Sequence, residues 1–105
     1  MARVEYEAFE KEEFEEYDIT MDMAPKLKAG ISIASIESSY PKATRISDGV
    51  DVTSTCIGTS SFVGAVITVR VKGGSDGQRI KIEFRVTDTA GEKFESGIIM
   101  EVEDI

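Results

Sequence analysis

The feature that most constrains the fold is a strict alternation of apolar and polar side chains in the last third of the chain. The apolar members of the first run are Ile80, Ile82, Phe84 and Val86, and the residues between them are charged or polar. A period of two predicts a β-strand with one buried and one solvent-exposed face. A second run places Phe94, Ile98, Met100 and Val102 on one face. The short Asp88–Gly91 segment between the runs predicts a hairpin.

Four earlier segments also have strand patterns. The predicted strands cover residues 17–23, 31–40, 50–57 and 62–71, with connecting turns at 42–49 and 58–61. A change of phase between Ile33 and Ile36 predicts a bulge. Six strands at regular spacing, without a helical pattern of adequate length between them, are typical of an antiparallel β-sandwich or a small barrel.

Length and cysteine content set the class of protein. A chain of 105 residues forms one domain with one modest core. The single cysteine, Cys56, excludes an internal disulfide, which favours a reducing cytoplasm or a particle assembled there. Without a long apolar run, neither a membrane-spanning helix nor a signal peptide is expected.

The negative charge is concentrated near the N-terminus. The chain has a formal net charge of −8, and most of it belongs to residues 1–22, where acids far outnumber Arg3 and Lys11. We therefore predict a flexible acidic arm over residues 1–13, followed by the folded domain over residues 14–105. The arm is equally consistent with a solvating tail and with a docking segment, because aromatic residues interleave its acids. The near-neutral remainder argues against binding to nucleic acid.

No segment predicts catalysis or a bound cofactor. Histidine is absent, which removes the side chain best suited to acid–base chemistry near neutral pH. The glycine-rich loop Gly73–Gly77 has neither the Lys-Ser/Thr pair nor the following helix of a phosphate-binding loop, so a simple connection with positive-φ glycines is favoured. Asp48 and Asp51 fit Asx-type turns better than a cation site. Cys56 has no histidine to act as its base.

The order of these motifs resembles the small phage fibre–tail adaptor proteins of tailed bacteriophages and prophages. The matching segments are Ile33-Ala34-Ser35, Gly73–Gly77 and Thr87–Gly91, and the resemblance covers about residues 14–103. Met23 departs from the family, which often has an aromatic residue there. The resemblance implies an immunoglobulin-like antiparallel β-sandwich of six or seven strands without catalytic residues.

The resemblance also implies a function. It predicts a non-enzymatic structural adaptor of a phage tail or neck, located in the virion and, during assembly, in the bacterial cytoplasm. Its partners would be other tail or neck proteins, and self-association into a homo-oligomer is left open. Binding to nucleic acid or to a membrane is not expected. The candidate contact residues are Tyr6, Phe9, Phe14, Gly73, Gly74, Ser75, Asp76 and Gly77.

The alternative is a stand-alone immunoglobulin-like carbohydrate-binding module. Such modules usually present exposed aromatic platforms, and this chain has no Trp, three Tyr and five Phe. An enzyme is the least favoured class, because no catalytic motif is present.

Overall fold

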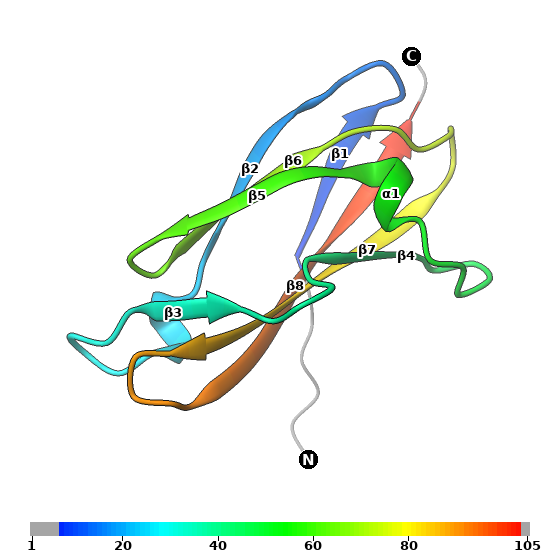
Figure 1. The fold of residues 1–105 in the computed structure, drawn as a ribbon. Helices are drawn as coiled ribbons and strands as arrows, with labels where there is room; N and C mark the ends of the chain where they lie inside the picture. The colour runs from blue at the N-terminus through cyan, green and yellow to red at the C-terminus, as the bar shows by residue number, and fades with distance from the viewer. Residues whose placement is uncertain (1–6, 104–105) are drawn as a thin grey trace.

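The hairpin predicted from the alternating residues forms the centre of the larger of two sheets. In the computed structural model, which describes residues 7–103, strand β7 (Arg79–Asp88) pairs antiparallel with β8 (Lys93–Glu103). Strand β1 (Ala8–Glu12) lies beside β8, and both β3 (Ile33–Ile36) and β4 (Lys42–Arg45) pair with β7. The smaller sheet has the order β2-β6-β5, from Tyr17–Asp22, Val66–Val71 and Ile57–Val63. Figure 1 shows the two sheets as the layers of a β-sandwich.

The core lies between the two layers. The alternating residues of β7 are fully buried, as predicted, and they face the buried residues of β6 across the sandwich. The buried apolar side chains of the three central strands are Ile67, Val69, Val71, Ile80, Ile82, Phe84, Val86, Met100 and Val102. The all-β prediction is therefore confirmed, whereas the immunoglobulin-like label stays a prediction.

The structure differs from the prediction at the N-terminus. Residues 8–12 form β1, which pairs in parallel with β8 from Ala8 opposite Ile99 to Glu12 opposite Glu103. The second half of the predicted arm is thus part of a sheet, and one pairing in the sandwich is parallel. Acid-rich sequence suggested a flexible arm, but Phe9 packs against the core and Lys11 is buried. Residues 1–6 lie outside the described residues.

Three predictions for the middle of the chain were wrong. Residues 42–45 form β4 instead of a turn, and residues 53–56 form a helical turn, α1 (Thr53–Cys56), where a strand was expected. The turn expected at 58–61 is strand instead, because β5 runs on to Val63 and the chain reverses at Gly64-Ala65. Residues 7–103 contain eight strands, more than the predicted six or seven.

The predicted irregularity in the second strand is confirmed. The register of β3 against β7 shifts between Ile33 and Ser35. A short 3-10 helix, η1 (Ala24–Lys26), follows β2.

Candidate functional site

Two segments far apart in the sequence meet at one end of the sandwich. The turn between β1 and β2, residues 13–16, lies beside the glycine-rich loop between β6 and β7. The Lys11 Nζ atom donates a hydrogen bond of 2.8 Å to the Gly73 carbonyl oxygen, and the Asp76 N–H donates one of 2.7 Å to Glu13 Oε1. We call this surface, residues 12–16 with 73–77, the acidic end. Phe14 and the loop Gly73–Gly77, predicted separately as contact residues, are therefore parts of one surface.

Phe14 is the most exposed large apolar side chain of the described residues, at 97%. Two of the hydrogen bonds that hold its turn link Glu12 and Glu15, from the Glu12 N–H to Glu15 Oε1 at 2.8 Å and from the Glu15 N–H to the Glu12 carbonyl oxygen at 3.1 Å. The ring stands in water on a fixed turn and contributes no burial to the fold, so its apolar surface remains free for a partner.

Lys11 links the turn to the loop through hydrogen bonds from its buried side chain. Its side chain is only 1% exposed, although it carries an ammonium group. Besides the bond to Gly73, the Nζ atom donates to the carbonyl oxygens of Glu12 at 2.8 Å and Glu13 at 3.3 Å. Burial lowers the pKa of Lys11, while the negative potential of Cys56 and the nearby glutamates opposes this shift. A buried charge persists where hydrogen bonds within the protein replace those to water. These carbonyl oxygens accept such bonds from the Lys11 ammonium.

The glycine-rich loop has the geometry of a tight connection, as predicted. Gly73, Gly74 and Gly77 all have positive φ angles, of 63°, 87° and 82°. A Cβ atom on Gly73 would lie 2.6 Å from the Thr55 carbonyl oxygen, so only glycine fits there without a shift of the backbone. The loop leads into strand β7 and not into a helix.

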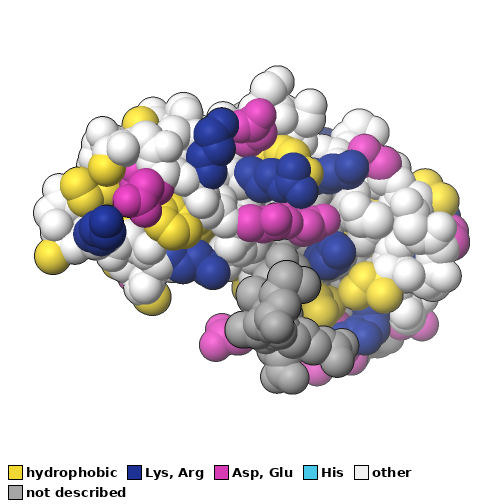
Figure 2. All heavy atoms as spheres, turned by 90° about the horizontal axis from the view of Figure 1, so that it is seen from below, with side chains coloured by type: hydrophobic (Ala, Val, Ile, Leu, Met, Phe, Trp, Pro, Cys, Tyr) yellow, Lys and Arg dark blue, Asp and Glu magenta, His cyan; other side chains and the backbone are white. Residues whose placement is uncertain are grey.

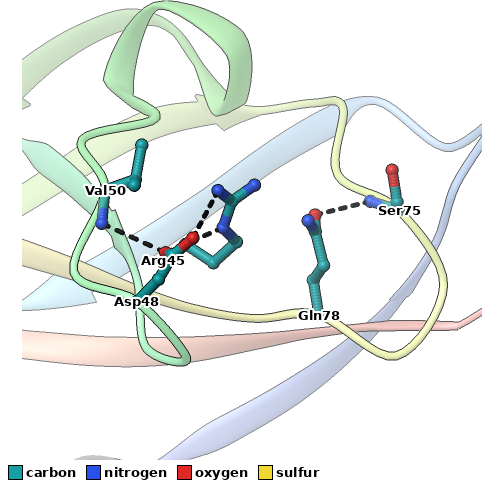
Figure 3. Close-up of polar contacts among 5 residues, drawn as sticks. All are labelled: Arg45, Asp48, Val50, Ser75 and Gln78. Atoms are coloured by element: carbon teal, nitrogen blue, oxygen red, sulfur yellow. Dashed lines mark hydrogen bonds and ion pairs between the residues drawn. The ribbon is translucent and has the colours of Figure 1, made fainter.

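A glutamine that the sequence did not single out closes this loop. The Ser75 N–H donates to Gln78 Oε1 at 2.8 Å (Figure 3). The Gln78 N–H donates in turn to the Ser75 carbonyl oxygen at 3.0 Å. The sequence feature that could have identified Gln78 is the position of a polar residue directly after the glycine-rich segment. Gln78, together with Lys11, therefore holds the acidic end in shape.

The two other predicted aromatic contact residues lie elsewhere. The Phe9 ring packs edge-on against Tyr17, with ring centroids 6.4 Å apart, and it contacts the core. The Tyr17 hydroxyl donates to the Glu10 carbonyl oxygen at 3.2 Å, and burial, with a smaller effect of Glu15, raises the pKa of Tyr17. Tyr6 lies outside the described residues. Phe9 is thus a packing residue of β1, and its partner contact stays a prediction.

Glutamates flank Phe14 along the chain. Glu12 ends strand β1, and Glu13, Glu15 and Glu16 lie in the turn itself. Arg70 on β6 forms ion pairs with Glu16 at 3.1 Å and with Asp18 at 3.4 Å, which leaves the other glutamates without a basic side chain in ion-pair contact among the described residues. The surface therefore combines one exposed apolar ring with more acidic than basic side chains.

The outer face of the larger sheet has a different charge pattern. Ion pairs link Arg79 to Glu101 and Arg85 to Glu95 across β7 and β8, at 4.0 and 3.6 Å. In Figure 2, which views the molecule from below, basic and acidic side chains adjoin one another. The charges of this face are largely paired within it, unlike those of the acidic end.

The Asx-type turns predicted around Asp48 and Asp51 are confirmed. Arg45 Nε and Nη2 donate to the two carboxylate oxygens of Asp48, at 2.9 and 2.6 Å, and the Val50 N–H donates to Asp48 Oδ1 at 3.2 Å (Figure 3). The Arg45 hydrogen bond lowers the pKa of Asp48, and the hydrogen bonds from Thr53 lower that of Asp51. Within residues 7–103, no three potential metal ligands of the His, Cys, Asp or Glu type gather around one point. No helix in that range is both long and apolar enough to cross a membrane.

A second exposed apolar feature was missed from the sequence. Val63 and Val66, which close the β5–β6 turn, are 83% and 36% exposed. The signal was available, since no charged residue lies between Asp51 and Arg70. We call β5, β6 as far as Val69 and their turn the uncharged hairpin.

Residues 11–101 match the family model described as "Podophage GP4 fiber-tail adaptor protein gp77". The match begins within β1, earlier than the resemblance seen in the sequence, and it includes the whole acidic end. No match was found among curated proteins or among solved structures. Because the family model covers most of the chain, the protein belongs to the podophage fiber-tail adaptor family and is a phage tail adaptor carried in the virion.

Proposed function

We propose that this tail adaptor is not an enzyme and that it works by protein–protein contact, with the acidic end as the docking surface for another tail or neck protein. The observation that carries the proposal is the 97% exposed ring of Phe14 on a hydrogen-bonded turn. Interfaces gain most of their affinity from a few anchors, commonly aromatic, that enter a pocket on the partner. Phe14 is such an anchor, carried on a turn whose backbone is hydrogen-bonded before binding.

The charges around Phe14 specify the partner surface. An apolar pocket rimmed by lysine or arginine side chains complements an exposed ring whose neighbours in the chain are Glu13, Glu15 and Glu16. The bonds from Lys11 and Gln78 hold the turn and the loop in place, so less conformational entropy is lost on docking. We infer neither nucleic acid nor a membrane as a partner, and we place assembly in the bacterial cytoplasm before the virion is released.

The experiment is to measure incorporation of Phe14→Ala into phage particles. The number of adaptor chains relative to the capsid protein is quantified in purified particles by mass spectrometry. We expect a marked loss with Phe14→Ala and partial retention with Phe14→Leu, which keeps an apolar side chain. Ile46→Ala is the matched control, because Ile46 is also an exposed apolar residue but lies outside the acidic end.

Equal incorporation of Phe14→Ala and Ile46→Ala would contradict docking through this surface. Raising the salt concentration gives an independent readout with isolated partner proteins. Screening shortens the range of charge attraction from about 8 Å at physiological ionic strength to about 3 Å at 1 M, so an association steered by the glutamates weakens.

Carbohydrate binding has less support from the described aromatic residues. Tyr17 packs against Phe9, and the Arg85 guanidinium lies 4.8 Å from the centre of the Tyr40 ring. Each of these tyrosines therefore has part of its ring in contact with the rest of the protein, unlike the fully exposed rings of a sugar-binding platform. Titration with polysaccharides while tyrosine fluorescence is recorded separates the two functions, and a saturable change would favour the module.

A further inference from the structure

The outer edge of strand β5 is open and carries no charge. In the smaller sheet β5 pairs with β6 alone, so one side of its backbone has no strand beside it among the described residues. Free strand edges are templates for pairing with another chain, and proteins usually protect them with charged side chains. The absence of charge between Asp51 and Arg70 leaves β5 without this protection.

The other edges are protected by charge or by contacts. Strand β1 carries acids and the buried Lys11, β2 carries Asp18 and Asp22, and β4 begins with Lys42 and ends with Arg45. Strand β3 is uncharged, but it is short, and the Ile33 N–H already donates to the Gly64 carbonyl oxygen at 2.9 Å. On β5 a register shift between Ile57 and Ser60 disturbs only the first half of the strand.

The turn to β6 determines which groups of β5 face outward. Gly64, the first of two turn residues, has a φ angle of 60°, as in a type II′ hairpin turn. Such a turn closes on a hydrogen-bonded pair, here Val63 with Val66. Since hydrogen-bonded and non-hydrogen-bonded pairs alternate along an antiparallel ladder, the backbone groups of Phe62 and Ser60 point away from β6.

We propose that β5 pairs antiparallel with β5 of a second copy of this chain, about a two-fold axis that passes through Ser61. Ser60 of each copy then faces Phe62 of the other, and these are the two residues whose backbone groups point outward. The smaller sheets of the two copies join edge to edge.

We take a second copy of this chain as the occupant because, of the two edge strands of the smaller sheet, β5 is the one on which two identical strands meet without like charges. Two chains of net charge −8 repel each other, and pairing β1 or β2 with itself would add like charges at close range. Self-pairing of β5 adds no charged pair across the axis. The contact leaves the acidic end of each copy free, so it does not depend on the docking proposed for Phe14.

The expected dimer is weak in dilute solution. Pairing one short strand edge buries less than the roughly 1,200–2,000 Å² of a standard interface, so we expect a dissociation constant in the range of about 1 μM to 1 mM. In an assembled particle, neighbouring copies are held at high local concentration, which favours the same contact.

The test is sedimentation equilibrium of the full chain and of charge variants at Ser61. Ser61→Lys places two ammonium groups opposite each other on the axis, and Ser61→Glu places two carboxylates there. Each variant alone should raise the dimer dissociation constant at least about fivefold, which corresponds to about 1 kcal/mol. An equal mixture of the two variants should recover the dimer, because opposite charges then face each other.

Thr20→Lys is the matched control. Thr20 on β2 and Ser61 on β5 are both exposed, and they flank the same residue, Thr68, from its two sides in the smaller sheet. Thr20→Lys should leave the dissociation constant unchanged. A wild-type chain that stays monomeric up to about 1 mM would overturn the proposal, since that is the weakest affinity expected. A dimer insensitive to both Ser61 variants, or failing to recover in the mixture, would also overturn it.

Discussion

The acidic end and the uncharged hairpin both present an apolar side chain that the fold does not bury. Phe14 is 97% exposed and Val63 is 83% exposed. Side chains fix the first region, through Lys11, Glu13 and Gln78, whereas the turn of the second is joined to Ile33 and Met23 by backbone hydrogen bonds alone. The comparison teaches that similar exposure can serve two kinds of contact, one set by a charged side-chain surface and one by a free backbone edge.

The largest expected effect concerns the side-chain fixing of the acidic end. Lys11→Ala removes a buried stem and leaves the Gly73 and Glu12 carbonyl oxygens without their donor. We expect the free energy of unfolding in urea to fall by about 2–4 kcal/mol. Lys28→Ala should cost less than about 0.5 kcal/mol, because the Lys28 side chain is 76% exposed in its ion pair with Glu92. Equal losses would show that the buried lysine is not what holds this end.

A second effect distinguishes the glycines of the loop. Gly73→Ala and Gly77→Ala share the cost of a positive φ angle, about 1–2 kcal/mol, but only Gly73 lies against the backbone of Thr55. We expect Gly73→Ala to be the more destabilising by about 1–3 kcal/mol in thermal or urea unfolding. If the two variants unfold alike, the close approach of this loop to the α1 turn has no energetic role.

The pH dependence of stability provides a third test of Lys11. Because burial lowers its pKa in the folded state, the unfolded chain holds the proton more tightly in the pH range just below 10.5. The Lys11 contribution to the free energy of unfolding therefore rises as the pH increases through that range. The measurement is the difference between wild type and Lys11→Met, which cancels the titration of Tyr17 and Cys56 to first order. A difference that stays constant or reverses its slope would contradict a desolvated ammonium.

The smallest expected effect is the change in the free energy of unfolding when the exposed side chain of Phe14 or Val63 is shortened. Phe14→Ala and Val63→Ala should each change the free energy of unfolding by less than about 0.5 kcal/mol, because neither side chain packs against the core. Phe84→Ala, in the buried centre, should cost about 3–5 kcal/mol and calibrates the measurement. A large loss of stability in Phe14→Ala would show that the ring packs against the core, and it would remove the basis for its docking role.

The central hairpin could be predicted because local and tertiary demands agree there. Every second residue of β7 from Ile80 to Val86 is apolar, and each of them is buried. Strand β4 could not be found in this way, since Ala43 is its one buried side chain and strand pairing with β7 is what orders it.

The α1 turn was missed because a local hydrogen bond outweighed strand propensity. Asp51 Oδ1 accepts the Thr53 N–H at 2.9 Å and starts a helical turn where threonine and serine had suggested a strand. At the acidic end, Phe14 and the glycine loop could be chosen from the sequence. Their proximity could not, because Lys11 joins them by bonds to backbone oxygens that no side-chain pattern records.

The parallel pairing of β1 with β8 has a mechanical consequence for a tail component. A pull on Ala8 and an opposite pull on Glu103 would act along both strands, at opposite ends of one ladder. Such a load shears all the hydrogen bonds of the ladder together, whereas a load across the strands would open them one after another. In this adaptor, strands β1 and β8 would therefore resist a pull along their length in shear.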